Sequence, residues 1–216
     1  MVRLKKSPLP AGLMIKKEQD YRSDPIFKLI RDDCFDKCYI CEEKEPTGLQ
    51  VEHRIAHRGD KALILCWDNL LLSCYHCNRT KGDNFNRIIN CTQLDPEEYI
   101  AISMMPFPKE YVEIAILRDT IEAKETAALL NLIYNGEKTD ILCAECINLR
   151  KRILQELNNM QEKLDDYDRE KNQKNKNEYL QSIIRMIDRS AAFAAIKRAV
   201  IRNTPAYMHE FGKYLA

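Results

Sequence analysis

The sequence predicts an α+β protein, in which a small zinc-stapled unit of two short strands and a helix precedes a mostly α-helical C-terminal half. Two Cys-x-x-Cys pairs enclose a short, turn-rich segment. Apolar residues recur every three or four positions through the C-terminal third, as on one face of a helix. The chain has 216 residues, enough to bury a core without disulfides.

Composition excludes several protein classes. The chain is 45% hydrophobic and 31% charged, as in an ordinary soluble globular protein. No apolar run approaches the ~18 residues of a membrane span. The charged start MVRLKKSPLP has no hydrophobic region behind it, so we expect neither secretion nor membrane insertion. Nine cysteines in such a chain indicate a reducing compartment, the cytoplasm by default, with some cysteines binding metal.

The charge is nearly balanced overall but uneven along the chain. There are 34 basic and 33 acidic residues. Residues 1–30 carry a net +4 (7 basic, 3 acidic), as do residues 151–216 (13 basic, 9 acidic), whereas residues 91–150 carry −6 (5 basic, 11 acidic). The acidic middle is best explained as solvated helix faces. A polyanion would be held by a patch drawn from both ends of the chain or by a second protein.

The N-terminal region predicts an arm followed by a helix. Residues 1–24 are basic, and Pro8 and Pro10 favour extended backbone, so we expect an arm that leads into the first domain. Pro25 then suits the first turn of a short helix that runs to about Asp36.

The next segment is short and turn-rich from Cys38 onward. Alternation and composition predict a strand over Leu49–Ile55 and a second apolar stretch over Trp67–Leu72. A helix is expected after Cys74, running to about Ile89.

Longer helical periods are expected beyond Cys91. A turn at Pro106 and Pro108 and a break at Asn135-Gly136 interrupt them. Two halves of the chain are therefore implied, joined within about residues 91–110.

The C-terminal third predicts two antiparallel helices. One apolar stripe is formed by residues at helical spacing: Leu149, Ile153, Leu157, Met160 and Leu164. Lys171–Asn177 has no apolar residue and reads as a solvated helix end or loop. A helix over about Tyr179–Arg202 would then pack back on its predecessor.

The two Cys-x-x-Cys pairs predict a structural zinc site. Together they supply four sulfurs for tetrahedral Zn²⁺, from Cys38, Cys41, Cys74 and Cys77. The gap between the pairs, residues 42–73, is 32 residues long, beyond the ~15–20 of a plain zinc ribbon. The longer gap therefore indicates additional structure between the two cysteine pairs. Four reduced core cysteines without metal are the weaker reading, because two matched pairs seldom arise by accident.

The gap and the second pair hold a further set of residues. Glu52-His53 ends the first strand, Asn69-Leu70 precedes the second pair, and Asn78 and Lys81 follow it on the helix. With these residues the segment resembles the HNH endonucleases, whose ββα-metal unit holds a catalytic divalent ion. The resemblance implies an HNH domain over residues 25–110 and catalytic roles for His53, Glu52, Asn78 and Asn69.

The chemistry of phosphodiester hydrolysis agrees with this resemblance. The reaction needs a base that deprotonates water, and the imidazole of His53, with an ordinary pKa near ~6.5, suits that task. Oxygens of Glu52 and Asn78 suit a hard ion, Mg²⁺ or Mn²⁺. By strand alternation Glu52 points to the opposite face from His53, so it serves the metal only if the strand end twists or bulges. Many HNH proteins have Asp where this chain has Glu52 and His where it has Asn78.

A narrower resemblance is to the PtuB family, the HNH nuclease subunits of Septu and related retron-associated antiphage systems. It is carried by the start Lys5-Lys6-Ser7-Pro8, by Leu130-Asn131-Leu132 and by the segment from Ser190 to Phe193. It implies an ABC-type, PtuA-like ATPase partner docked on the helical domain, residues 111–216, or on the N-terminal arm. The substrate expected is DNA more than RNA.

A zinc-stabilised nucleic-acid-binding or adaptor module with an inactive HNH-like site is the alternative function. An inactive relative is free to lose His53, Glu52 or Asn78. All three positions carry competent side chains here, which favours the enzyme.

The remaining histidines and cysteines leave smaller questions. His76 could ligate zinc or contact phosphate, but a surface position is favoured, and His209 is expected to be structural or exposed. His57 is a candidate phosphate contact. Cys143 and Cys146 form a third Cys-x-x-Cys pair with no evident partner pair, and a second metal site is the less favoured reading. Two other cysteines are expected to be small buried apolar residues: Cys34 and Cys66.

Overall fold

The computed structural model describes residues 1–17, 19–136 and 140–215 and confirms the mixed α+β class. The helices and strands follow in the order α1 (Asp24–Asp33), β1 (Gln50–His53), α2 (Lys61–Ile64), β2 (Leu70–Ser73), α3 (Tyr75–Lys81), β3 (Ile100–Met105), β4 (Tyr111–Ile116), α4 (Ile121–Asn135), α5 (Asp140–Arg169), α6 (Gln173–Ile187), α7 (Ala194–Asn203) and α8 (Pro205–Phe211).

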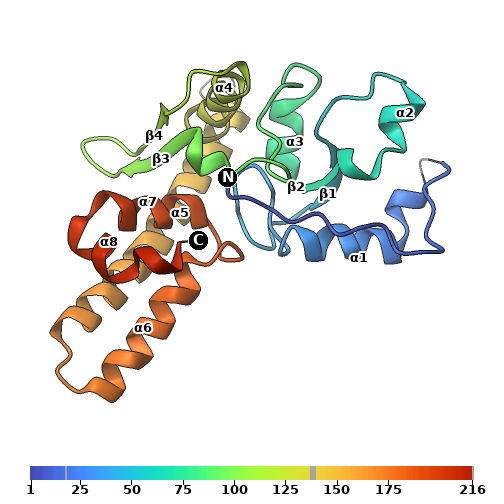
Figure 1. Ribbon diagram of the computed structural model, residues 1–216. Coiled ribbons are helices and arrows are strands. Elements are labelled where there is room, and N and C mark those ends of the chain that lie inside the picture. The colour runs from blue at the N-terminus through green and yellow to red at the C-terminus, as the bar shows by residue number, and fades with distance from the viewer. Residues whose placement is uncertain (18, 137–139, 216) are drawn as a thin grey trace.

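Strands β1 and β2 and helix α3 form one compact ββα unit. The strands pair antiparallel, with Val51 opposite Leu72 and His53 opposite Leu70. Strand β2 is buried along its whole length, which explains its unbroken apolar sequence. One residue, Cys74, separates β2 from α3. The unit therefore brings the end of β1 beside the first turns of α3 (Figure 1).

Helix α3 is shorter than the sequence predicted. It ends at Lys81 rather than near Ile89, and Gly82 follows with a φ of +46°. That backbone conformation suits glycine, and helices often end this way. The glycine was the signal for the helix end.

Residues 100–116 form a β-hairpin where the sequence predicted helical periods. Ile100 and Ile102 are buried, while the residues between them are partly exposed, which is the alternation of a half-buried strand. Strand β4 pairs with β3 from Met105 opposite Tyr111 to Ile100 opposite Ile116. The hairpin therefore spans the expected domain boundary at residues 110–111, and the division into domains stays a prediction.

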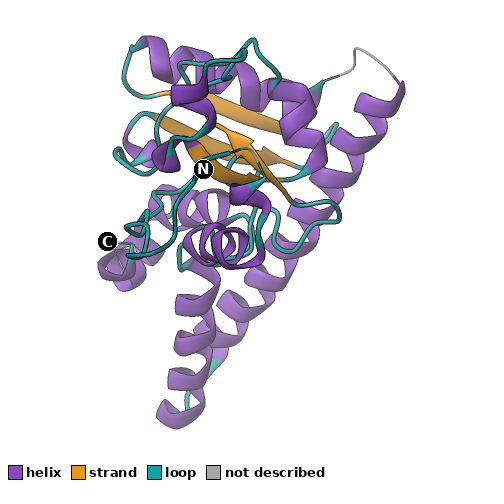
Figure 2. Ribbon diagram, turned by 90° about the vertical axis from the view of Figure 1, so that its right-hand side faces the viewer, coloured by secondary structure: helices purple, strands orange, loops and turns teal. Residues whose placement is uncertain are grey.

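The C-terminal half is helical, as predicted, but its last long helix is broken. Helices α5 and α6 pack antiparallel and extend away from the ββα unit (Figures 1 and 2). The polar segment Lys171–Asn177 contributes only a short turn, because Asn172 caps α6 by accepting from the amides of Lys174 and Asn175. The helix expected over Tyr179–Arg202 is interrupted after Ile187, and α7 begins at Ala194.

The N-terminal arm is extended but is part of the core. Met1, Val2 and Leu4 are buried, and the Leu4 amide donates to the Cys91 carbonyl at 2.8 Å. One hydrophobic cluster contains these residues together with the ββα unit, α4 and part of α5. The predicted extended arm therefore contributes its first residues to the core. Within the described ranges no helix is both long and apolar enough to cross a bilayer.

Candidate active site and zinc centre

The four predicted zinc cysteines lie together in the core. Their sulfur atoms are all within 4.8 Å of one another, and Sγ of Cys41 and Cys74 are 3.9 Å apart. Four sulfurs around Zn²⁺ at ~2.3 Å would be spaced by about 3.8 Å. All four cysteines are buried and none is in a disulfide. The cluster fits a soft tetrahedral ion, and among the described residues it is the one group of His, Cys, Asp and Glu found close enough to hold a metal.

The local backbone explains why the two cysteine pairs meet. In the first pair, the Cys38 amide donates to the Glu43 carbonyl and the Tyr39 amide donates to the Leu72 carbonyl at 2.8 Å. The second bond attaches the turn to β2. In the second pair, Cys74 caps α3 and its sulfur accepts from the Cys77 amide at 3.4 Å. A zinc ion here would tie α1, β2 and α3 to one point.

His53 lies at the end of β1, and its ring is held by the last residue of α2. Its Nε2 is 3.1 Å from the Ile64 carbonyl oxygen. A carbonyl only accepts, so Nε2 carries the proton and Nδ1 is the basic nitrogen of the neutral ring. The rings of Tyr21 and His57 meet the His53 ring edge-on, at centroid distances of 5.4 and 4.8 Å.

A pocket of about 190 Å³ surrounds this histidine. It brings together Glu52 and His53 from β1 and Asn78 and Lys81 from α3, with Asp83 just beyond that helix. The expected opposition of Glu52 and His53 does not keep them apart, because both residues line this pocket at the strand end.

Glu52 is buried, with 5% of its surface exposed, and both of its oxygens have partners. Oε1 is 2.6 Å from the Lys81 ammonium, and Oε2 accepts from the Tyr39 hydroxyl at 2.7 Å. Burial raises the pKa of Glu52, an effect that Lys81 and Tyr39 partly offset. The sequence marked Lys81 as a motif residue but assigned it no role.

Asn78 is held from the neighbouring strand. Its Nδ2 donates to Oε1 of Gln50 at 2.9 Å. The hydrogen bond uses the amide nitrogen, so the oxygen is the atom that suits a hard cation.

Asn69 holds the loop between β1 and α2. Its oxygen accepts from the Ile55 amide at 2.8 Å, and its nitrogen donates to the carbonyls of Ile55 and Leu63 at 3.0 and 3.2 Å. Asn69 is absent from the pocket lining. Leu63 precedes Ile64, whose carbonyl fixes His53, so the geometry makes Asn69 a positioning residue rather than a group that touches the reacting atoms.

The other histidines differ in their surroundings. The expected surface position of His76 is wrong, because its side chain is only 11% exposed and bridges Glu145 and the Ile133 carbonyl at 2.7 and 2.9 Å. Nδ1 of His57 accepts from the Gly59 amide, and His209 is exposed, as expected.

The cysteines outside the zinc cluster mostly act as small apolar residues. Cys34 is fully buried, as predicted, and burial raises its pKa to about 12; Cys66 is only partly buried. Cys143 and Cys146 lie on α5, and the Cys146 thiol donates to the Ile133 carbonyl.

Comparison with known proteins gives one match. Residues 38–84 match the family described as HNH endonuclease, and this range contains the zinc cysteines, both strands of the first sheet and α3. Residues 38–84 are thus similar to an HNH endonuclease domain, which supports a nuclease-like function and a nucleic-acid substrate. No curated protein and no solved structure matches the chain.

Proposed function

We propose that this protein is a metal-dependent HNH endonuclease that hydrolyses phosphodiester bonds in nucleic acid. The observation that carries the proposal is the pocket that gathers Glu52, His53 and Asn78 within the segment that matches the family. A general base and oxygen ligands for a hard cation are what this reaction requires of a protein.

His53 is the general base in this proposal. The Ile64 carbonyl holds Nε2–H, so Nδ1 receives the proton of the attacking water. The same carbonyl keeps the ring oriented after the proton has moved, because it accepts from Nε2 in both charge states. Asn69 serves this step indirectly by holding α2, the short helix that carries the carbonyl.

Glu52 and Asn78 would hold Mg²⁺ or Mn²⁺, which when bound supplies positive charge beside the phosphate. The donors fit such an ion, since one carboxylate and one amide oxygen leave room for water and substrate oxygens. The four sulfurs suit zinc instead. Each Glu52 oxygen has a second lone pair, so the Lys81 and Tyr39 bonds do not exhaust it.

We further propose that the nuclease is the effector of a bacterial antiphage complex with an ABC-type ATPase and acts in the cytoplasm, on DNA more than RNA. The sequence resemblance to the PtuB family supports the antiphage role and the ATPase partner. The charge supports dependence on a partner, because a chain of net charge +1 offers few groups that neutralise phosphate.

A zinc-stabilised binding or adaptor module is the second candidate. The buried pair of Glu52 and Lys81 favours it, because a carboxylate already neutralised by an ammonium at 2.6 Å is a poorer metal ligand.

Incubation of the purified protein with plasmid DNA and with total cellular RNA separates the two functions. Reactions contain Mg²⁺, Mn²⁺ or a chelator, each with and without the products of neighbouring genes. The nuclease gives metal-dependent nicks or breaks in one substrate. The adaptor module binds nucleic acid but leaves it intact under every condition.

A further inference from the structure

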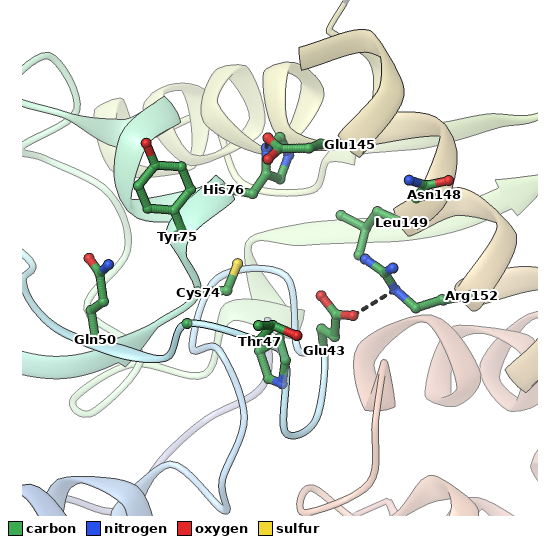
Figure 3. Close-up of a pocket in the computed structure, with 12 residues that line it drawn as sticks. Glu43, Thr47, Gln50, Cys74, Tyr75, His76, Glu145, Asn148, Leu149 and Arg152 are labelled. Carbon is green, nitrogen blue, oxygen red and sulfur yellow. Dashed lines mark hydrogen bonds and ion pairs between the residues drawn. The ribbon is translucent and has the colours of Figure 1, made fainter. Parts of the chain in front are cut away.

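A second pocket, of about 470 Å³, lies beside the catalytic pocket, where the ββα unit faces α5 (Figure 3). Gln50, Tyr75 and His76 line it from the ββα unit, and Leu149 and Arg152 line it from α5. Its volume is in the range of pockets that hold small ligands, roughly 300–1,000 Å³. The zinc ligand Cys74 also lines this pocket, but the proposed hydrolysis does not use it.

The charges in this second pocket are paired with each other. The Glu43 carboxylate is 2.6 Å from Nε of Arg152, and Glu145 is 2.7 Å from Nδ1 of His76. A bound phosphate would lie beside two carboxylates, which repel it. The lining instead suits an uncharged ring whose edge carries both hydrogen-bond donors and acceptors.

Tyr75 gives the pocket an aromatic wall. It is the first residue of α3, and 51% of its surface is exposed although it adjoins a buried zinc cysteine. In Figure 3 its ring stands on the opposite side of the pocket from Leu149. An exposed ring that faces an apolar side chain across a pocket is suited to stacking with a flat ligand.

The second pocket and the catalytic pocket meet at one hydrogen bond. Gln50 lines the former and Asn78 the latter, and the two side chains are joined at 2.9 Å. A nucleic-acid strand with a phosphate at His53 can therefore continue past the Gln50–Asn78 pair to the second pocket.

We propose that the second pocket receives an unpaired nucleobase of the substrate strand, stacked on Tyr75, next to the phosphodiester that is cut. This inference rests on the proposed nuclease function and adds a substrate class to it. A base within a duplex is stacked and paired, so it must be unstacked and unpaired before it can enter, whereas a single-stranded base avoids that cost. The enzyme should therefore prefer single-stranded or locally opened nucleic acid.

A binding assay tests this without turnover. In a His53→Ala background, affinity at low salt is measured for a single-stranded DNA, an RNA of the same sequence, a duplex and free mononucleotides. An abasic site is then moved along the single strand. We expect tighter binding of the single strand than of the duplex, weak binding of mononucleotides, and one position at which the abasic site weakens binding about 5- to 150-fold.

Two substitutions locate the effect. In Tyr75→Ala, the abasic site at the sensitive position should no longer weaken binding, whereas in Tyr75→Phe it should still do so. Zinc content reports whether either variant stays folded. Tyr111→Ala is the matched control, because Tyr111 is 47% exposed on β4 and lies outside the pocket.

Any of four results would overturn the proposal. These are equal affinity for single strand and duplex, an abasic profile without a distinct position, an unchanged profile in Tyr75→Ala, and absence of binding to every probe at low salt. Failure of the nuclease function is seen separately, as absence of cleavage by the protein with His53 intact.

Discussion

Lys81 is the residue on which the catalytic pocket depends for its charge balance. Its ammonium is 2.6 Å from Glu52 Oε1 and donates to the His53 carbonyl at 2.9 Å, and the residue is only 1% exposed. Removing one partner of such a buried pair leaves the other charge unpaired in a poorly solvated place, at a cost of about 3–5 kcal/mol.

We therefore expect Lys81→Met to lower the free energy of unfolding by about 3 kcal/mol, measured by denaturant titration without added Mg²⁺. Adding Glu52→Gln to this variant should restore part of the loss, because no unpaired carboxylate then remains. A Lys81→Met protein as stable as the parent would show that the pair contributes nothing.

For single residues, the sequence identified the chemically competent side chains better than it identified the contacts between them. Glu52, His53 and Asn78 were found because each has a chemical function at a recognisable spacing. The contacts of Glu52 with Lys81 and of His76 with Glu145 join residues 29 and 69 positions apart, and sequence periodicity carries no information about such distant pairs. Asn69 was assigned to catalysis, whereas its hydrogen bonds to the loop became visible only in three dimensions.

Among the elements, the two cysteine turns depend most on metal. They join α1, β2 and α3, and the strands between them are only four residues each. So short a sheet has little stability of its own.

We expect about one zinc per chain by elemental analysis, and Cys74→Ser should lose the ion and unfold rather than lose turnover alone. Cys143→Ser, on α5 and outside the cluster, is the control and should keep its zinc. A metal-free preparation with the thermal stability of the zinc-loaded protein would contradict the assignment.

Elements were predicted well where one local signal dominated and poorly where two competed. Glycine ended α3 earlier than the apolar pattern suggested. The helical spacing of apolar residues continues across residues 188–193, but the helix is interrupted there because backbone amides bond to Glu42 instead. The Phe193 amide donates to the Glu42 carbonyl, and the Ala195 amide donates to the Glu42 carboxylate. Strands β3 and β4 have only six residues each and alternate between buried and exposed positions over part of that length, too little to outweigh the helical composition around them.

The core of the molecule consists of two apolar clusters that meet along α5. The N-terminal residues, the zinc turns, α4 and the first part of α5 belong to one cluster, while the last part of α5, α6 and α8 belong to the second. Met1, Val2 and Leu4 at the start of the arm are buried, while other arm residues such as Arg3 and Lys5 are exposed. The α5–α6 pair, which projects from the rest of the molecule, is a second place for the proposed partner (Figure 2).

At this scale we expect coexpression with neighbouring genes to yield a complex by size-exclusion chromatography. Binding to nucleic acid without the partner should be weak and should fall steeply with salt. A protein that stays monomeric beside every neighbour, yet cuts efficiently at physiological salt, would show that partner dependence is wrong.

The central claim is that His53 performs the chemistry, and single-turnover cleavage by His53→Ala tests it most directly. Zinc content and thermal stability are measured on the same sample, with His57→Ala as the neighbouring-histidine control. The account predicts that cleavage falls by about 10²- to 10⁴-fold in His53→Ala while both other measurements stay unchanged. The fall in His57→Ala, whose ring contacts His53 and lines the same pocket, should be smaller. Cleavage at the parental rate in a folded, zinc-loaded His53→Ala protein would contradict it.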